Sequence, residues 1–485
     1  MLGRATTHAL VGLEPRRVEV EAHLANGTPS LTIVGLADRA CQEAKERVRS
    51  GITSAELKWP QARVVVNLAP AGLRKEGSAF DLSIALAILA ASGQVEPNSL
   101  LGHAVVGELA LDGRLRPVGG VLAVAEGAKR LGLERILCPA ESSPEAALAG
   151  VEPIPLRHLA EAVSYLSGGI RPPPYVPPNE HRPPAPAPDL ADVRGQERAR
   201  RALELAAAGR HNLLLAGPPG TGKTMLARRL PGILPVLGRS EALEVTRIHS
   251  VAGVLDCSGA LIETPPFRAP HHSASMAAVV GGGLGPRPGE ASLAHHGVLL
   301  LDEFPEFQRS VLEALRQPLE DGSISIARAA GRAVFPARFQ LVATMNLCPC
   351  GGRADPSSEC SCAPQQLARF RAKLSQALLD RFDLVVTMPR PRAHELATGP
   401  GESSGSVRAR VVGARTRLDT DYPARSEDAS ALLDTAVDRL PLSGRGRARV
   451  ARVAATVAAL AGSDQVGAEH LAEALSYRSP RELGS

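Results

Sequence analysis

The 485-residue sequence is poor in several residue types that often carry function. Aromatic residues make up only 3% of it, with a single tryptophan. No run approaches the ~20 consecutive apolar residues that a membrane-spanning helix needs, and the first residues lack the apolar core of a signal peptide. These absences argue against membrane-spanning and secreted proteins, so we expect a cytoplasmic protein with no membrane partner. Lysine is also scarce, and its six positions are Lys45, Lys58, Lys75, Lys129, Lys223 and Lys373.

The remaining composition is that of folded protein domains. Hydrophobic residues account for 44% of the chain and charged residues for 22%, a balance typical of soluble globular proteins. The length predicts two or three domains, each able to bury its own core. The net charge of +5 is too small to require or exclude a nucleic-acid partner, so local features must decide that question.

Four of the seven cysteines form a cluster. Cys348 and Cys350 make one Cys-x-Cys pair, and Cys360 and Cys362 make another shortly after it. In a reducing compartment, clustered thiols favour a metal over disulfides, and four thiolates suit tetrahedral Zn²⁺. The spacing is tighter than the usual Cys-x2-Cys, so a structural zinc site and a set of metal-free thiols both remain open.

A proline-rich segment divides the chain. Residues 167–190 favour extended polyproline II and predict a semi-rigid linker. Residues 1–166 before it mix strand-like runs such as Arg63–Asn67 with helix-like runs such as Phe80–Ala91, which predicts an α/β domain. Residues 191–392 read as a parallel sheet wrapped by helices, and residues 393–485 as a linker followed by helices.

The central segment carries a complete phosphate-binding pattern. Strand-like Leu213–Ala216 precedes a glycine-rich loop, and helical periodicity follows from Lys223. Glycines in such a loop let backbone N–H groups turn towards phosphates, while the lysine reaches the β and γ oxygens and the final threonine ligates Mg²⁺. The pattern predicts binding of ATP and Mg²⁺ by Gly217, Pro218, Pro219, Gly220, Thr221, Gly222, Lys223 and Thr224.

Four later residues supply the rest of a hydrolytic site. Apolar Val298–Leu301 ends in Asp302 and Glu303, which predicts that Asp302 holds Mg²⁺ and that Glu303 polarises the attacking water. Asn346 ends another expected strand and is suited to orient that water or sense the γ-phosphate. Arg381, in Leu-Leu-Asp-Arg-Phe-Asp, would be an arginine finger, although an ordinary surface ion pair gives the same pattern.

Together these motifs resemble the AAA+ ATPases of the magnesium-chelatase-like group, including its bacterial competence proteins. The resemblance covers nearly the whole chain and includes Pro266–Ser275, Arg287–Gly297 and Leu312–Gly322. It implies a ring of six copies in which Arg381 acts on the neighbouring copy's ATP. It also implies that the carboxyl-terminal helices form a lid, with Arg445 as its sensor-2 residue.

The amino-terminal domain resembles the proteolytic domain of Lon, which implies a ribosomal-S5-domain-2-like fold. A Ser–Lys dyad needs a serine nucleophile and a lysine that can be neutral. Ser78 stands one position from the place expected for the serine, and apolar Leu122 stands where the lysine is expected. We therefore expect a non-proteolytic domain that serves ring assembly or DNA contact.

Residues 322–335 alternate apolar residues around a turn, which predicts a β-hairpin. In related rings the corresponding hairpin faces the pore, and an insert would occupy Phe267–Gly289. The resemblance makes single-stranded or branched DNA the expected partner, in branch migration during natural transformation. Because aromatic residues are few, the grip should rely on phosphates. The candidate contacts are Arg268, Arg287, Arg328 and Arg332.

Two other functions remain as alternatives. The chain could be the motor of a magnesium or cobalt chelatase, although the amino-terminal domain argues against that. It could also be a Lon-type peptidase or a scaffold.

Overall fold

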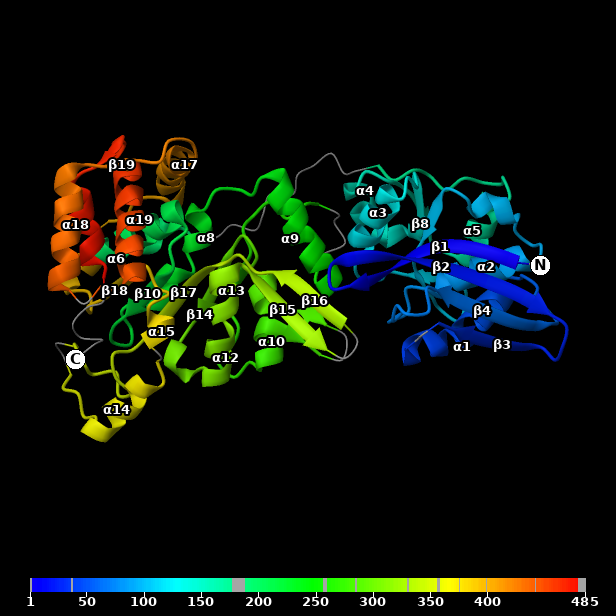
Figure 1. Cartoon of the computed structure of the whole chain (residues 1–485), viewed down its shortest axis with the longest axis horizontal. Helices are drawn as coiled ribbons and strands as arrows, with labels where there is room; N and C mark the ends of the chain where they lie inside the picture. The colour runs from blue at the N-terminus through cyan, green and yellow to red at the C-terminus, as the bar shows by residue number, and fades with distance from the viewer. Residues whose placement is uncertain are drawn as a thin grey trace.

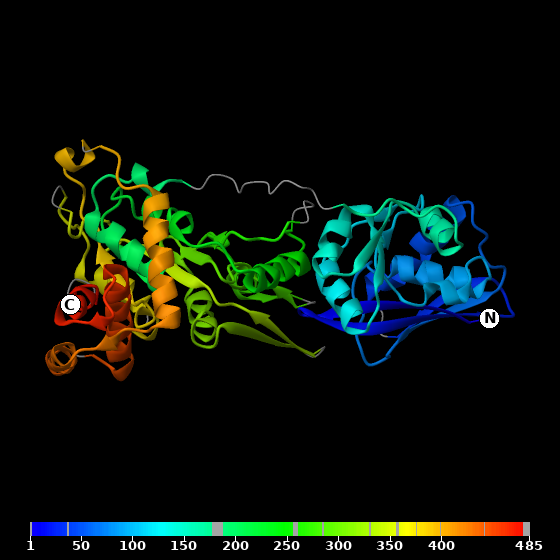
Figure 2. The ribbon, with the colours of Figure 1, turned by 90° about the horizontal axis from the view of Figure 1, so that it is seen from above.

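The computed structural model describes residues 2–35, 38–176, 188–255, 260–283, 286–328, 331–355, 358–374, 376–397, 399–440 and 442–478. Three parts lie in a row along the long axis of the molecule (Figure 1), and the view from above shows the same order (Figure 2). The amino-terminal domain is at one end, the domain with the glycine-rich loop is in the middle, and the carboxyl-terminal helices are at the other end. The proline-rich segment was expected over 167–190, and its residues 177–187 lie outside the described part of the chain.

The amino-terminal domain is built on a mixed sheet in the order β3-β4-β2-β1-β5-β8-β9. Strands β1 and β2 form a long antiparallel hairpin, whereas β1, β5, β8 and β9 run parallel. The α/β character expected here is confirmed, although the long first hairpin was not predicted. The strands are β1 (Leu2–Val11), β2 (Glu14–Ala25), β3 (Ser30–Val34), β4 (Arg63–Ala69), β5 (His103–Val105), β8 (Arg135–Pro139) and β9 (Glu152–Leu156), with a short pair β6 (Glu108–Leu109) and β7 (Leu115–Arg116).

Helices cover both faces of this sheet. Successive side chains of a strand point to opposite faces of the sheet. Val105 packs in one apolar cluster, while its neighbours Ala104 and Val106 pack in another, so both faces are covered. Helices α1, α2 and α5 contribute to the first cluster, and α3 and α4 to the second. The bounds are α1 (Arg39–Ser54), α2 (Asp81–Ala91), α3 (Val121–Arg130), α4 (Ser143–Leu148) and α5 (Leu159–Leu166), with 3-10 turns at Pro97–Leu100 and Ala140–Ser142.

The central domain contains the expected parallel sheet, in the order β11-β14-β17-β10-β18. The interior strands β14, β17 and β10 are completely buried, which explains the uninterrupted apolar sequences of β14 and β10. Since all five strands are parallel, the loops that follow them gather at one edge of the sheet. The strands are β10 (Leu213–Ala216), β11 (Phe267–Arg268), β14 (Val298–Leu301), β17 (Gln340–Met345) and β18 (Leu384–Thr387).

Two small antiparallel pairs project from this sheet. The expected hairpin is confirmed as β15 (Ser323–Arg328) and β16 (Gly331–Pro336), while β12 (Gly281–Gly282) pairs with β13 (Arg287–Pro288) inside the expected insert. The surrounding helices are α6 (Glu197–Gly209), α7 (Lys223–Ala227), α8 (Leu230–Ile233), α9 (Arg239–Ala252), α10 (Met276–Val280), α11 (Glu290–Leu293), α12 (Arg309–Ala314), α13 (Arg316–Asp321), α14 (Pro364–Ala372), α15 (Gln376–Leu379) and α16 (Ala393–Leu396), with 3-10 turns at Leu190–Asp192 and Phe304–Glu306.

The carboxyl-terminal part is helical, as expected. It contains α17 (Ser404–Thr420), α18 (Glu427–Arg439), α19 (Gly444–Ala461) and α20 (Ala468–Ser476), with a short parallel pair β19 (Ala424–Arg425) and β20 (Gln465–Val466). The sequence pattern did not predict α17, because Gly405 and Gly413 lower its helix propensity. A hydroxyl cap from Ser403 and packing against α6 and α19 stabilise it instead. None of the described helices combines the length and apolar character required to cross a bilayer.

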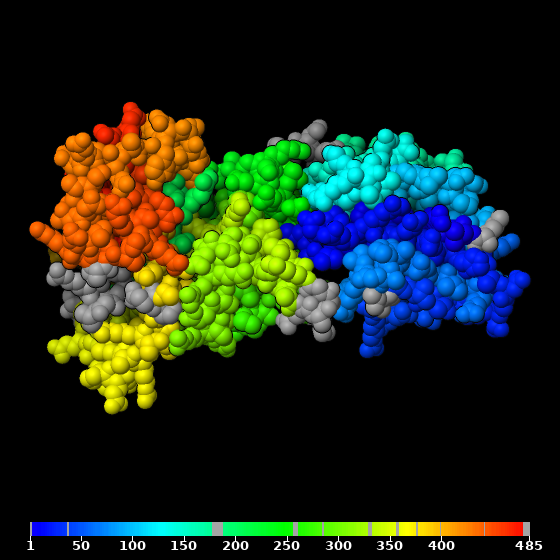
Figure 3. Space-filling view, in the orientation of Figure 1, coloured from blue at the N-terminus to red at the C-terminus, as the bar shows by residue number. Residues whose placement is uncertain are grey.

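The amino-terminal domain contacts the central domain through α9. Arg247 of α9 pairs with Glu126 of α3 at 3.1 Å, and the hydroxyl of Ser250 donates to the half-buried carboxylate of Glu145. Leu13, in the turn between β1 and β2, packs with Phe335 of β16 in a small apolar cluster. In the space-filling view the two domains meet in the middle of the molecule (Figure 3). The turn of one domain therefore supports the hairpin of the other.

Candidate nucleotide site

The glycine-rich loop follows β10 and leads into α7. Gly217 has φ +157°, and a Cβ atom there would lie 2.3 Å from the carbonyl oxygen of Met388. Gly222 caps α7 with φ +86°, in the left-handed region. Gly220 also has a positive φ, of +78°. The chain therefore requires glycine at the positions that the phosphate-binding pattern specifies.

Lys223 is held within this loop. Its ammonium donates hydrogen bonds to the carbonyl oxygens of Gly217 and Pro218, both at 2.8 Å, and to Oδ1 of Asn346 at 3.1 Å. Burial lowers its pKa to about 8, against the opposing effect of Asp302 and Glu303. The structure thus brings together Lys223 and Asn346, which are far apart in the sequence.

Asp302 stands at the end of β14, next to the loop. Its Oδ1 accepts a hydrogen bond from Oγ1 of Thr224 at 2.8 Å and another from Oγ1 of Thr344 at 2.5 Å. A hydroxyl and a carboxylate oxygen in contact are the donor types that Mg²⁺ selects. Thr344 in turn accepts the backbone N–H of Glu303 at 3.1 Å. Sequence reasoning gave Thr344 no role, because its contact with Asp302 forms only where β17 lies beside β14.

Glu303 follows Asp302 directly. Its backbone lies in the left-handed region, with φ +55°, which is uncommon for a side chain of this size. The carboxylate is 62% exposed, and its Oε2 lies 3.6 Å from Nδ1 of His272. An exposed carboxylate beside the loop is placed to meet a water molecule that approaches the phosphates.

A cavity of about 820 Å³ lies next to the loop, between the start of α6 and the segment after β18. Gln196 forms part of its wall and donates to the carbonyl oxygens of Thr221 and Pro389, at 3.4 and 2.7 Å. The side chain of Gln196 therefore links the wall of this cavity to the glycine-rich loop.

Arg381 and Arg445 lie elsewhere. Nδ2 of Asn212 donates to the carbonyl oxygen of Arg381, and Asn212 immediately precedes β10, so Arg381 stands at the edge of the sheet opposite the loop. Arg381 forms an ion pair with Glu320, and Arg445 lies 3.4 Å from the same carboxylate. The structure thus brings these two arginines together but separates them from the chain's own loop.

The four clustered cysteines converge. Sulfur atoms of Cys348, Cys350 and Cys360 are 3.4 to 3.7 Å apart, and the ligand atoms of all four cysteines lie within 4.8 Å of one another. Tetrahedral zinc with Zn–S bonds of about 2.3 Å would require sulfur separations of about 3.8 Å, so the donor set fits this ion.

Backbone groups support the cysteine cluster. The N–H of Gly352 donates to the sulfur of Cys350, which holds the pKa of that thiol well below its usual range. A Cβ atom on Gly351 would lie 2.8 Å from Cδ of Pro219, so the cysteine loop packs directly on the phosphate-binding loop. In Figure 1, α14 extends from the central domain just after this segment.

The candidate DNA contacts have different surroundings. Arg268 is bound by Glu290 through two hydrogen bonds of 2.6 and 2.8 Å, so its charge is already paired. Arg287 is exposed on β13, and Arg332 is exposed on β16, where its Nε donates to Ser325 at 2.7 Å. Arg328 ends β15, and its side chain lies outside the described part of the structure. Their role in DNA binding stays a prediction, which the pairing of Arg268 does not favour.

Two further groups of residues concern peptidase activity and metal binding. Ser78 donates to the carboxylate of Glu108. Leu122, at the position where the lysine of a Ser–Lys dyad was expected, is buried in the core. Nε2 atoms of His295 and His296 both lie close to Oε2 of Glu244, at 3.0 and 3.1 Å. Nδ1 of His295 accepts the backbone N–H of Arg338, so Nε2 must carry the proton and cannot ligate a metal.

Comparison with known proteins agrees with this arrangement. The family model for magnesium chelatase, subunit ChlI, matches residues 189–396. Models for subunit ChlI of Mg-chelatase and for the ChlI carboxyl-terminal region match residues 20–142 and 401–478. The chain belongs to the magnesium-chelatase family. Because that family consists of AAA+ ATPases, the chain is an ATPase of this type. Binding of ATP and Mg²⁺ by its glycine-rich loop stays a prediction.

Three relatives refine the placement within the magnesium-chelatase family. An uncharacterised protein of Mycobacterium tuberculosis is 47% identical over 98% of both chains. YifB of Escherichia coli is 43% identical, and competence protein ComM of Haemophilus influenzae is 42% identical; each match covers 98% of this chain and 96% of the relative. The chain is therefore a ComM/YifB-like member of the family, as the motifs predicted. The Lon-like fold of its first domain remains a prediction.

Proposed function

We propose that the protein is a DNA motor that works as a ring of six copies and hydrolyses ATP between neighbouring copies. The observation that carries this proposal is the separation of Arg381 from the chain's own glycine-rich loop. Both sets of groups are built for phosphate, yet they occupy opposite edges of one parallel sheet. A second copy can join them only in a head-to-tail arrangement, and such an arrangement forms a ring when the rotation between copies closes.

Each group then has a definite task. Backbone N–H groups of residues 217–224 and the ammonium of Lys223 bind the phosphates, while Thr224 and Asp302 would hold Mg²⁺, which would supply positive charge to the phosphates. Glu303 orients and polarises the attacking water, Asn346 senses the γ-phosphate through its contact with Lys223, and the cavity beside Gln196 takes the base. Arg381 and Arg445 of the neighbouring copy neutralise the charge of the transition state.

We propose DNA as the substrate of this motor. The relative from Haemophilus influenzae is named a competence protein, which supports single-stranded or branched DNA as the substrate during natural transformation. We propose that the mechanical step is branch migration and that the hairpin β15–β16 drives it. Exposed Arg287 and Arg332 on the two small strand pairs supply contacts to DNA phosphates. The four cysteines would hold one structural Zn²⁺, which would stiffen the loop packed on Pro219.

The decisive experiment measures ATP hydrolysis and DNA binding together. Single-stranded DNA and a four-way junction should each raise the ATPase rate, and binding should weaken steeply with salt because phosphates are the contacted groups. The variant Glu303→Gln should bind ATP, assemble and remain on the junction without turnover. An ATPase indifferent to both DNA forms, with no affinity for either at low salt, would exclude a DNA motor and favour a chelatase motor.

A further inference from the structure

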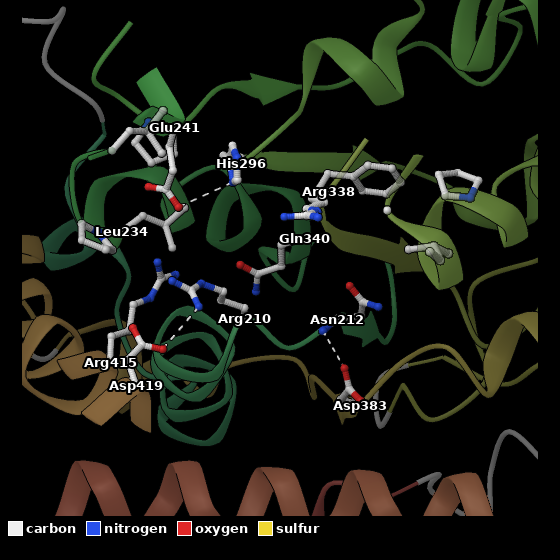
Figure 4. Close-up of a pocket in the computed structure, with 18 of the residues that line it drawn as sticks. Arg210, Asn212, Leu234, Glu241, His296, Arg338, Gln340, Asp383, Arg415 and Asp419 are labelled. Atoms are coloured by element: carbon white, nitrogen blue, oxygen red, sulfur yellow. Dashed lines mark hydrogen bonds and ion pairs between the residues drawn. The ribbon is translucent and has the colours of Figure 1, made fainter. Parts of the chain in front are cut away.

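A cavity of about 760 Å³ lies at the edge of the central sheet opposite the glycine-rich loop. Asn212, Gln340 and Asp383 line it where β10, β17 and β18 begin (Figure 4). None of the residues that line it comes from the loop itself. The cavity is therefore distinct from the chain's own nucleotide site.

Two buried arginines reach this cavity with unused hydrogen-bonding capacity. Arg381 is 5% exposed and Arg449 is 8% exposed, and both belong to the cavity wall. Within the described part of the chain, Nε of Arg381 and Nη1 of Arg449 have no hydrogen-bond partner. A buried guanidinium N–H without an acceptor is costly, so both atoms indicate an acceptor that another molecule provides.

The charges around these arginines are unbalanced. Helix α19 carries Arg445, Arg449 and Arg452 at spacings of four and three, which places them on one helical face. Glu320 forms ion pairs with Arg381 and Arg445, while Oδ1 of Asp383 lies 3.5 Å from nitrogen atoms of both Arg449 and Arg452. Four guanidinium groups thus share two carboxylates, and burial lowers the pKa of both Arg381 and Arg449.

We propose that Arg449 binds the phosphates of a nucleotide held by a second copy of the chain, together with Arg381 and Arg445. This inference rests on the proposed intersubunit site and adds a residue to it. Phosphate suits the place because its oxygens accept the forked N–H groups of guanidinium. The chain's own nucleotide cannot reach it, since the four residues of β10 alone separate the two edges by ~13 Å. Glu320 and Asp383 hold the arginines until that phosphate arrives.

Mixed rings test this assignment. Copies carrying Lys223→Ala lack a working loop but keep every arginine, whereas copies carrying Arg449→Ala keep the loop. Each variant alone should hydrolyse ATP at least about tenfold more slowly than the unaltered chain, the loss expected for a charged contact. If Arg449 acts across the interface, an equimolar mixture should recover roughly one quarter of the unaltered rate, since random assembly pairs the intact halves at that frequency.

One further mixture and one control variant distinguish a failure of the role of Arg449 from a failure of the intersubunit site. Arg381→Ala mixed with Lys223→Ala reports the proposed intersubunit site itself, and Arg447→Ala, on the same helix but paired with Asp434, is the matched control that should retain activity alone. Recovery with Arg381→Ala but not with Arg449→Ala overturns the role of Arg449 and leaves the intersubunit site intact. Recovery with neither overturns both. If Arg449→Ala misfolds, Arg449→Lys takes its place in the mixture, because lysine keeps the positive charge that faces Asp383. Recovery of the ATPase rate in that mixture supports the role of Arg449, and a lack of recovery overturns that role.

Discussion

Thr344 shows how a single hydroxyl can serve two acidic residues. It donates to Asp302 and accepts from the backbone of Glu303, so it fixes both the proposed Mg²⁺ ligand and the residue that polarises water. Replacing it with isosteric valine removes a hydrogen bond to a charged group, worth about 1.5–3 kcal/mol. We expect Thr344→Val to lower kcat by roughly tenfold or more, measured by steady-state ATPase kinetics with a Mg²⁺ titration.

Thr344→Ser provides the matched control because it keeps the hydroxyl, and its kcat should stay within a few-fold of the original. Equal rates in the serine and valine variants would contradict the role assigned to Thr344.

We expect His211 to make the free energy of unfolding depend on pH. It is buried between the central domain and α19, where Nε2 lies 2.8 Å from Oγ1 of Thr456 and Nδ1 lies 4.0 Å from Asp383. Burial, with a small contribution from Arg452, lowers its pKa to about 4, although Asp383 opposes the shift. Between pH 6.5 and about 4 the unfolded chain binds the extra proton, so stability is complete above that window and falls with pH inside it.

The contribution of His211 amounts to up to about 3 kcal/mol. Urea unfolding at pH 7 and pH 5 should therefore show a smaller pH dependence for His211→Gln than for the unaltered chain. Exposed His394 offers the control, since His394→Gln should leave the dependence unchanged. The same slope in all three proteins would refute this prediction.

At the scale of elements, the turn between β1 and β2 supports the hairpin β15–β16. Leu13 packs with Ile248 of α9 and Phe335 of β16, and a charge in that contact would be buried without a partner. We expect Leu13→Asp to increase amide hydrogen exchange in β16 and α9 at least tenfold while α2 stays protected. Leu101→Asp, at a side chain that is 73% exposed, should change neither segment.

The cysteine loop is a second element whose order should depend on one ligand. We expect the purified chain to contain about one equivalent of zinc, measured by elemental analysis, and Cys360→Ser to lose it. Loss of the ion should raise the KM for ATP because the loop packs on Pro219. Cys41→Ala alters a cysteine outside the cluster and should keep the metal. Full zinc content in Cys360→Ser would show that the cluster does not hold it.

At the scale of the whole molecule, a site shared between copies makes activity depend on assembly. The ATPase rate per chain should rise with protein concentration and reach a plateau when rings are complete. Arg381→Ala should remain about 10³-fold slower or more at that plateau, yet bind ATP normally at its own loop. A rate per chain that stays constant on dilution to monomers, checked by analytical ultracentrifugation, would rule out a shared site.

Sequence alone located the strand–loop–helix unit of the nucleotide site, since Leu213–Ala216 and Val298–Leu301 are strands with the expected bounds. Such elements are encoded locally, by apolar runs and by glycines at positive φ. It missed α17 because contacts with distant helices, rather than propensity, stabilise that segment. Thr344 escaped for a similar reason, as its importance arises only when β17 lies beside β14.

The motifs thus determined the chemistry of this protein, including phosphate binding, the acidic pair and the cysteine cluster, because spacing along the chain fixes which donors an element can present. Only the tertiary structure decided where those donors meet. It placed Arg381 and Arg445 around Glu320, away from the loop, and aligned Arg449 with them. Contacts between residues far apart in the sequence depend on how strands and helices pack together. A sequence pattern that is analysed one segment at a time does not specify that packing.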